Sequence, residues 1–135
     1  MSHYQKIKCQ IREAALLIEA LKKLGYSNVE HHEEAQHLYG YMGDRRPETA
    51  EIIIRRKSVG RLSNDIGFKR QDNGEFTAII SDYDRSRHNT AWLQKLNKEY
   101  AYSLVKAYAV EQDLVVESEV VGADGEIVIL LSERG

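Results

Sequence analysis

The stretch from residue 65 to residue 81 constrains the fold of this chain more than any other segment. It consists of two runs rich in apolar and β-branched residues, DIGFKR and EFTAIIS, joined by QDNG. Asn73 and Gly74 can adopt the positive φ angles that a type I′ turn requires, so the two runs are predicted to pair as a β-hairpin. Alternation within the first run then places Ile66 and Phe68 in the core. A hairpin in the middle of the chain favours an antiparallel sheet.

The apolar periodicity of the remaining sequence predicts further strands and two helices. Alternating apolar residues indicate strands at residues 4–11, 50–57, 114–121 and 126–131, with a short strand after residue 26. Apolar residues three and four positions apart indicate helices at residues 12–24 and 91–112.

The second predicted helix begins after a capping residue, either Asn89 or Thr90. Its inner apolar stripe consists of Leu93, Leu96, Tyr100, Leu104 and Ala107. Beyond this helix, Asp124 and Gly125 predict a second tight turn, which joins the two C-terminal strands in a hairpin.

Two segments interrupt this pattern. Residues 32–49 and 58–64 are predicted to be mobile loops because they are polar or interrupted by glycine, and Pro47 is expected to end any β-ladder near it.

The order of the elements predicts an α+β fold. We expect a mainly antiparallel sheet of about seven strands, with two amphipathic helices packed on one face, in a single domain over residues 1–135.

Charge and cysteine content indicate the environment of the protein. Its 135 residues contain 19 Lys and Arg against 21 Asp and Glu, a net charge of -2, so bulk charge recruits neither nucleic acid nor an anionic membrane. The single cysteine, Cys9, cannot form an intramolecular disulfide, and the N-terminal segment lacks the apolar stretch of a secretory signal. No run approaches the ~18 apolar residues that span a bilayer. We therefore expect a cytoplasmic protein without membrane contact.

Several stretches resemble one family when they are considered together. They are MSHY, LGY, GYMG, NDIGFKR and the long C-terminal run WLQKLNKEYAYSLVKAYAVEQDLVVESEVVGADGEIVILL. The chain resembles the hypothetical chloroplast reading frame family, an uncharacterised domain of unknown function in cyanobacteria, plastids, other bacteria and phages. The resemblance covers almost the whole chain, although RSRHNT stands where the family leads us to expect another aromatic residue. It implies a cytosolic accessory protein and assigns no catalytic residue.

The segment HHEEAQH, residues 31–37, contains several residue types that bind metals. A helical zinc motif requires two histidines four positions apart, whereas His32 and His37 are five positions apart. On a strand, the side chains would be divided between two faces, which leaves no closed ligand set. We therefore predict a solvated strand end, with no metal site and no cofactor.

Asp65, Asp82 and Asp84 are the candidate catalytic residues. Asp82 and Asp84 follow a predicted strand, and the hairpin places the start of the neighbouring strand, at Asp65, beside its end. Three carboxylates could hold Mg²⁺ and let it polarise a phosphate, so metal-dependent phosphate chemistry is one alternative function. Aspartate is also common at strand ends because it forms turns with its own backbone.

Cations are concentrated in the centre of the chain. Residues 41–90 contain ten cations and eight acids, whereas the last 25 residues contain seven acids and one arginine. The candidate nucleic-acid-binding residues are Tyr41, Arg55, Arg56 and Arg61, because tyrosine stacks on bases and arginine binds phosphate. Nucleic-acid or nucleotide binding is therefore a second alternative, and a wet sheet face with paired charges is the simpler interpretation.

The outer face of the second predicted helix provides the candidate partner-binding residues. Lys98, Tyr102 and Lys106 lie along a stripe opposite the inner apolar stripe. Aromatic residues on such a face are typical of protein interfaces. Because no catalytic constellation is evident and the net charge is small, the preferred prediction is a binding or adaptor protein without enzymatic activity. Its partner is another protein, and a homodimer is an alternative.

Overall fold

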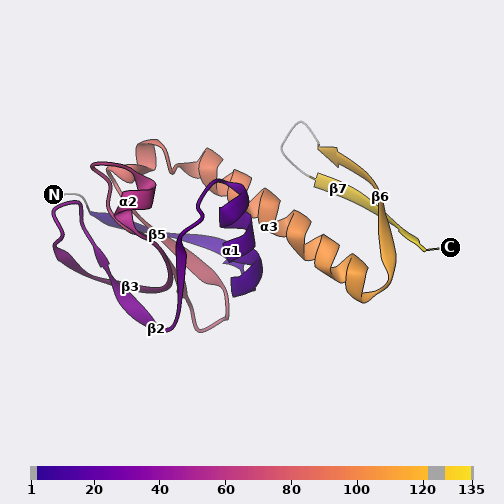
Figure 1. The fold of residues 1–135 in the computed structure, drawn as a ribbon, viewed down its shortest axis with the longest axis horizontal. Helices are drawn as coiled ribbons and strands as arrows, with labels where there is room; N and C mark the ends of the chain where they lie inside the picture. The colour runs from indigo at the N-terminus through magenta and orange to yellow at the C-terminus, as the bar shows by residue number, and fades with distance from the viewer. Residues whose placement is uncertain (1–2, 122–126, 135) are drawn as a thin grey trace.

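The computed structural model describes residues 3–121 and 127–134. Within them, five strands form one antiparallel sheet in the order β1-β5-β4-β3-β2 (Figure 1). The strands are β1 (Tyr4–Ile11), β2 (Val29–Tyr39), β3 (Arg45–Ile54), β4 (Ile66–Arg70) and β5 (Phe76–Ser81). β1 and β2 are the two edge strands, and β4 lies in the middle of the sheet.

The remaining two described strands form a separate hairpin. Figure 1 shows β6 (Leu114–Val121) and β7 (Ile127–Glu133) beyond the end of a long helix, away from the five-stranded sheet. The α+β class and the antiparallel pairing are therefore confirmed, but the expected sheet of about seven strands is divided into five and two. The described helices are α1 (Ala14–Lys23), the one-turn α2 (Arg56–Val59), α3 (Thr90–Glu111) and a 3₁₀ turn, η1 (Asp84–Ser86).

The main core lies between one face of the sheet and the two long helices, α1 and α3. Leucine side chains from both helices pack against isoleucine and phenylalanine side chains of the sheet. The residues of this core include Leu17, Leu21, Leu93, Leu96, Ile52, Ile54, Ile66, Phe68 and Phe76. The prediction that both amphipathic helices cover one face is therefore confirmed, as is the inward orientation of Ile66 and Phe68. A smaller cluster on the opposite face consists of Leu38, Ala50, Ile53 and Ile79.

α3 is longer than the surface on which it packs. Its first half buries Leu93, Leu96 and Tyr100, whereas Leu104 is 43% exposed and Ala107 is also exposed. The prediction that Leu104 and Ala107 belong to the inner stripe is therefore wrong. The reason is geometric, because the 22 residues of α3 extend about 33 Å while a central strand of 6 residues spans only about 20 Å.

The turn between β4 and β5 differs from the predicted type I′ turn. Gly74 has a φ of 87°, but the described positive-φ residues do not include Asn73. The Gly74 N–H donates to the Gln71 carbonyl at 2.9 Å, and the Gln71 N–H donates to the Glu75 carbonyl at 2.8 Å. This is a three-residue hairpin loop in which a glycine in the left-handed region follows a type I turn. The second predicted turn, at Asp124 and Gly125, lies outside the described residues.

Much of the segment predicted to be a mobile loop, residues 32–49, forms strands β2 and β3. Burial explains the difference, because Leu38 and Ala50 are fully buried on the face of the sheet opposite the helices. Pro47 lies within β3, where it was expected to end the ladder. It falls in a register shift between the pairs His37↔Thr49 and Tyr39↔Arg45, where the missing N–H interrupts no regular pair.

Candidate functional site

A buried carboxylate joins two strand ends immediately before β4. Asp65 is 1% exposed, and its Oδ2 accepts hydrogen bonds from the Tyr39 N–H and from Arg55 Nη1, both at 2.8 Å. Its Oδ1 accepts from the Arg56 N–H at 2.7 Å. Asp65 therefore connects the end of β2 to the start of α2, and each of its oxygens has a strong donor.

Asn64 and Asp84 form a second buried connection. Asp84 Oδ2 accepts from the Asn64 N–H at 3.0 Å, from Asn64 Nδ2 at 3.3 Å and from Ser81 Oγ at 2.8 Å. The side chain of Asn64 also contacts a third segment, because its Oδ1 accepts a hydrogen bond from the Tyr41 N–H at 3.0 Å. These bonds hold together the loops at residues 40–44, 58–64 and 82–87, which we call the three-loop end of the molecule.

The structure places the three candidate catalytic aspartates in different roles. Asp65 and Asp84 are buried and accept several hydrogen bonds from within the fold, whereas Asp82 is exposed and accepts a bond from Gln5 Nε2 at 3.2 Å. Asn64 lies next to Asp65 and is bonded to Asp84, so the hairpin does bring these two carboxylates to one region. No group of three metal-binding side chains occurs among the described residues.

Arg55 differs from the other candidate nucleic-acid-binding residues because it is engaged within the fold. Its Nε donates to Glu30 Oε2 at 2.8 Å, and its Nη1 bonds to Asp65 and to the His37 carbonyl. The hydrogen bond to Glu30 is the largest cause of a raised pKa at Arg55, and the same bond lowers the pKa of Glu30. The side chain of Arg55 therefore supports the packing of β2 against β3.

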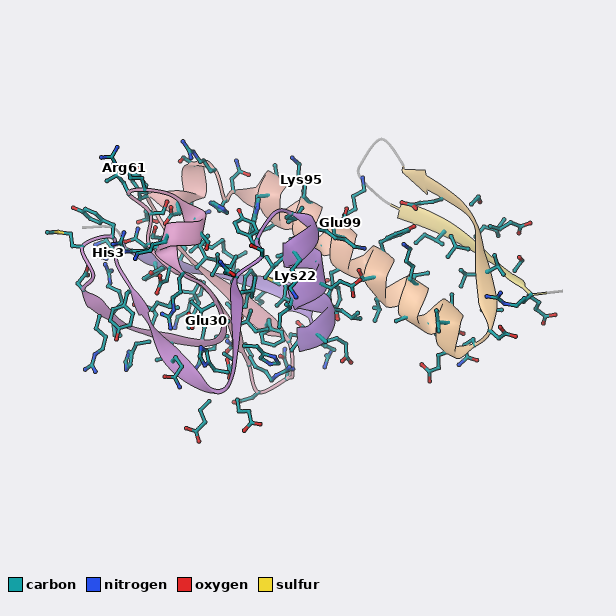
Figure 2. The ribbon with its side chains drawn as sticks, in the orientation of Figure 1. His3, Lys22, Glu30, Arg61, Lys95 and Glu99 are labelled. Atoms are coloured by element: carbon teal, nitrogen blue, oxygen red, sulfur yellow. The ribbon has the colours of Figure 1, made fainter. Side chains whose placement is uncertain are left out.

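Tyr41 and Arg61 remain exposed at the three-loop end, and Arg56 is half-buried. Figure 2 shows Arg61 extending outward beside α2. A hollow of about 300 Å³ lies next to Arg61. It is lined by Gly60, Arg61, Leu62, Ser63, Tyr83, Asp84, Ser86 and Arg87. Arg61 and Arg87 both fall in the central cationic region of the sequence, but neither Tyr83 nor Arg87 was selected from it as a candidate binding residue. Tyr83 and Arg87 lie near Arg61 because the buried contact between Asn64 and Asp84 brings their two loops together. A contact of this kind produces no periodic pattern in the sequence.

The outer stripe of α3 is less available than its residue types suggest. Tyr102 is half-buried, with Lys106 Nζ 4.3 Å and Lys23 Nζ 5.5 Å from the centre of its ring. Both ammonium groups are within the range of a cation–π contact. Lys98 is also half-buried. The phenol ring of Tyr102 is therefore already in contact with two cations of its own chain.

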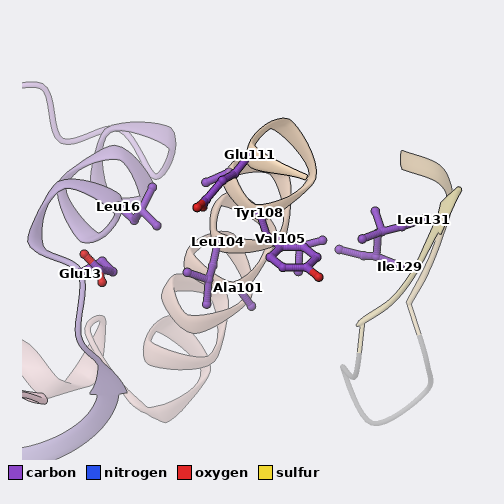
Figure 3. A pocket seen from close by; sticks show the side chains of 10 residues that line it. Glu13, Leu16, Ala101, Leu104, Val105, Tyr108, Glu111, Ile129 and Leu131 are labelled. Atoms are coloured by element: carbon purple, nitrogen blue, oxygen red, sulfur yellow. The ribbon is translucent and has the colours of Figure 1, made fainter. Parts of the chain in front are cut away.

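A different surface of α3 is open and apolar. A groove of about 850 Å³ lies over the second half of the helix, with α1 and β7 on either side (Figure 3). Its lining residues are Glu13, Leu16, Ala101, Leu104, Val105, Ala107, Tyr108, Glu111, Ile129 and Leu131. Figure 3 shows Val105 and Tyr108 on the side of α3 that faces β7, and Leu104 on the side nearer α1. Sequence reasoning missed this groove because it assigned Leu104 to the core.

Tyr100 fixes the α1 wall of this groove. Its hydroxyl oxygen accepts hydrogen bonds from the Arg12 N–H at 3.2 Å and the Glu13 N–H at 3.0 Å, just before α1 begins. The Glu13 N–H, at the N-cap, belongs to the set that has no partner within the helix. The contact holds the start of α1 against the middle of α3, so the groove has one firmly placed side.

An aromatic cluster around the buried His88 lies at the start of α3. His88 Nε2 is 2.6 Å from the Tyr26 hydroxyl, and the His88 ring packs against Trp92 with ring centres 4.8 Å apart. Burial lowers the pKa of His88, while the nearby charge of Asp84 acts in the opposite direction. His88 Nδ1 is buried without a hydrogen-bond partner in the described structure. The cluster is therefore suited to a neutral imidazole.

In the described part of the chain, no helix combines the length and the apolar character needed to cross a membrane.

Comparisons with known proteins give one family and no closer relative. Neither the comparison with curated proteins nor that with solved structures found a match. The model of one family, described as "Protein of unknown function (DUF1257)", matches residues 20–130. This match confirms the expectation of an uncharacterised family. The chain therefore belongs to the DUF1257 family.

Proposed function

We propose that this protein is a binding or adaptor protein that holds a helical segment of a protein partner in the groove over α3. The observation that carries the proposal is the apolar stripe of Ala101, Leu104, Val105 and Tyr108, which lines the groove and leaves Leu104 43% and Tyr108 53% exposed. These residues are spaced at i, i+3, i+4 and i+7, so they form one face of a helix. An open apolar face of this kind marks an interaction surface.

The charge around the groove supports a basic partner. Glu13 and Glu111 line the groove and are exposed, and the exposed Glu119 of β6 is paired across the hairpin with Ile129, which also lines the groove. An amphipathic helix with leucines on one face and lysines beside them would bury its apolar side chains against α3 and place its cations next to these carboxylates. The proposal assigns no catalytic residue. A cytoplasmic location fits a protein whose one thiol, on Cys9, is buried.

A synthetic peptide provides a defined test. An amphipathic helical peptide of Leu and Lys is labelled, and its binding is measured by fluorescence anisotropy beside a Leu and Glu peptide of the same pattern and a scrambled Leu and Lys peptide. We expect the patterned Leu and Lys peptide to bind best. The double variant Leu104→Glu, Tyr108→Glu should lose at least about tenfold in affinity, because two exposed apolar contacts are replaced by charges. Both positions are exposed, so thermal melting should remain close to that of the wild type.

The control is the double variant Tyr102→Ala, Lys106→Ala on the outer stripe of α3. It should retain the affinity of the wild type, because neither residue lines the groove. If this control loses binding while Leu104→Glu, Tyr108→Glu retains it, the outer stripe is the contact surface and the groove proposal is wrong. Equal binding of the Leu and Glu peptide would contradict the proposed basic partner.

A further inference from the structure

We propose that the three-loop end of the molecule binds single-stranded nucleic acid, with Arg61, Arg85 and Arg87 contacting phosphates and Tyr41 and Tyr83 stacking on bases. This surface is separate from the groove over α3. Figure 1 shows α2, which ends within the segment 58–64, and the β6–β7 hairpin at opposite ends of α3. The inference therefore goes beyond the proposed function and stands or falls independently of it.

The arginines at this end are available for a ligand. Arg61, Arg85 and Arg87 are exposed, and none of the ion pairs in the described parts of the chain involves them. Of the nearby acids, Asp84 is 3% exposed and its Oδ2 accepts three hydrogen bonds from within the protein, and the residue also lines the hollow beside Arg61. Asp44 is half-buried, and its Oδ2 lies 3.7 Å from Arg46 Nη1. Asp82 is exposed, and its Oδ1 accepts a bond from Gln5. Residues 58–64 and 82–87 therefore present the three exposed arginines against the one exposed carboxylate of Asp82, and this excess of positive charge suits a phosphate backbone.

Two exposed aromatic rings distinguish this surface from a general anion site. Tyr83 is 51% exposed and lines the hollow of about 300 Å³ together with Arg61 and Arg87. Tyr41 is 45% exposed, and its backbone is bonded to Asn64 in the neighbouring loop. Exposed rings beside cations can stack on bases, but only where the bases are unpaired and unstacked. This geometry favours a single strand over a duplex.

The buried network beneath the surface fixes the relative positions of these groups. Asn64 is 1% exposed and contacts all three loops, through Tyr41, through its own segment and through Asp84. Loops that are held in place before binding lose less conformational freedom when the ligand arrives. The three-loop end is therefore a preorganised surface.

The first test uses a labelled single-stranded RNA of about 20 nucleotides and the full-length protein, with binding followed by fluorescence anisotropy between about 50 mM and 200 mM salt. Three phosphate contacts predict a loss of affinity of about 20-fold over this range, since each contact contributes a slope of roughly 0.7 in log K against log salt. The triple variant Arg61→Ala, Arg85→Ala, Arg87→Ala should lose most of the binding and most of the salt dependence.

A matched control carries the same change of charge on another surface. The triple variant Lys95→Ala, Lys98→Ala, Lys106→Ala changes α3 and should keep the affinity of the wild type for the RNA. If both triple variants weaken binding equally, the interaction is a general effect of net charge and the proposal is wrong. Absence of binding by the wild type at the lowest salt concentration would also overturn it.

The stacking contact is tested separately from the phosphate contacts. Tyr83→Ala should lower the affinity at least about fivefold, whereas Tyr83→Phe should keep it because the ring is retained. Duplex DNA of the same sequence and inorganic polyphosphate serve as competitors, and both should compete poorly. Competition by polyphosphate as strong as that by RNA, with no effect of Tyr83→Ala, would show an anion site and would rule out the nucleic-acid assignment. Single-stranded DNA of the same sequence distinguishes base stacking alone from recognition of the RNA 2′-hydroxyl.

Discussion

Gly67 of β4 lies so close to Ala50 of β3 that a Cβ atom on Gly67 would be 2.7 Å from the Ala50 Cβ. Two methyl carbons of Leu38 would be at 3.0 and 3.1 Å from the same atom. The φ angle of Gly67 is not in the left-handed region, so the constraint is one of space alone. Glycine at position 67 and the small side chain of Ala50 therefore allow β4 to pack closely beneath the smaller apolar cluster on this face of the sheet.

Gly67→Ala should therefore destabilise the protein by about 1–3 kcal/mol, because an added methyl group overpacks a site enclosed by the Ala50 methyl group and by a buried leucine. Chemical denaturation with urea measures the change. The combined variant Gly67→Ala, Ala50→Gly restores the missing space and should recover part of the loss. A single variant as stable as the wild type would mean that Leu38 moves aside at little cost.

Asp65→Asn should reduce the free energy of unfolding by about 3 kcal/mol or more, since it leaves Arg55 without its buried partner and places an amide beside backbone donors. Asp82→Asn is the matched control, and it should be nearly neutral because Asp82 is exposed. Thermal melts of both variants provide the comparison. Equal effects at the two positions would contradict the structural role assigned to Asp65.

Gly74→Ala should destabilise the β4–β5 hairpin by about 1 kcal/mol, because alanine is strained at the observed φ of 87°. Gly74→Asn should be milder, since asparagine tolerates the left-handed region better than alanine does. The order of melting temperatures, wild type first, then asparagine and then alanine, tests the turn geometry. An alanine variant that melts with the wild type would be inconsistent with the three-residue loop.

His88 predicts a loss of stability in mild acid. Its pKa is lowered in the folded protein by burial, so above about pH 6.5 the imidazole is neutral in both states and contributes no pH dependence. As the pH falls below that value, the unfolded chain binds the proton first, and the folded state is destabilised. The melting temperature should therefore decrease between about pH 7 and pH 5.

The variant His88→Gln should show a shallower decrease over the same range, and the exposed His31→Gln should retain that of the wild type. Differential scanning calorimetry at several pH values measures both. An unchanged pH dependence in His88→Gln would assign the effect to other groups.

Local sequence patterns predicted the elements better than their arrangement. The hairpin of β4 and β5 and the inward positions of Ile66 and Phe68 follow from alternation, which is a property of each strand by itself. Pro47 was misinterpreted because its tolerance depends on a register shift in the partner strand. The division of the sheet into five and two strands depends on the length of α3 relative to the strands beneath it, which no local period records.

The candidate site shows the same limit. Asp65 was singled out as a candidate catalytic residue by its residue type and its position at a strand start, and that role stays a prediction. The donors that engage it come from Tyr39, Arg55 and Arg56, which the local pattern does not indicate. The exposed Leu104 was predicted to be buried, because a helical stripe indicates which side is apolar and not what covers it. The groove therefore became visible only once α3 was placed on the sheet.

α3 also sets the angular relationship between the two ends of the molecule. Its 22 residues form a rod that connects the three-loop end to the β6–β7 hairpin. The length of this helix therefore sets both the distance between the two ends and the rotation of one end relative to the other about the helix axis. An insertion of four residues in the helix would add about 6 Å with a rotation of only about 40°, whereas an insertion of two would turn the hairpin by about 200°. If the protein brings a strand of nucleic acid and a protein segment together, the second insertion would direct them to opposite sides.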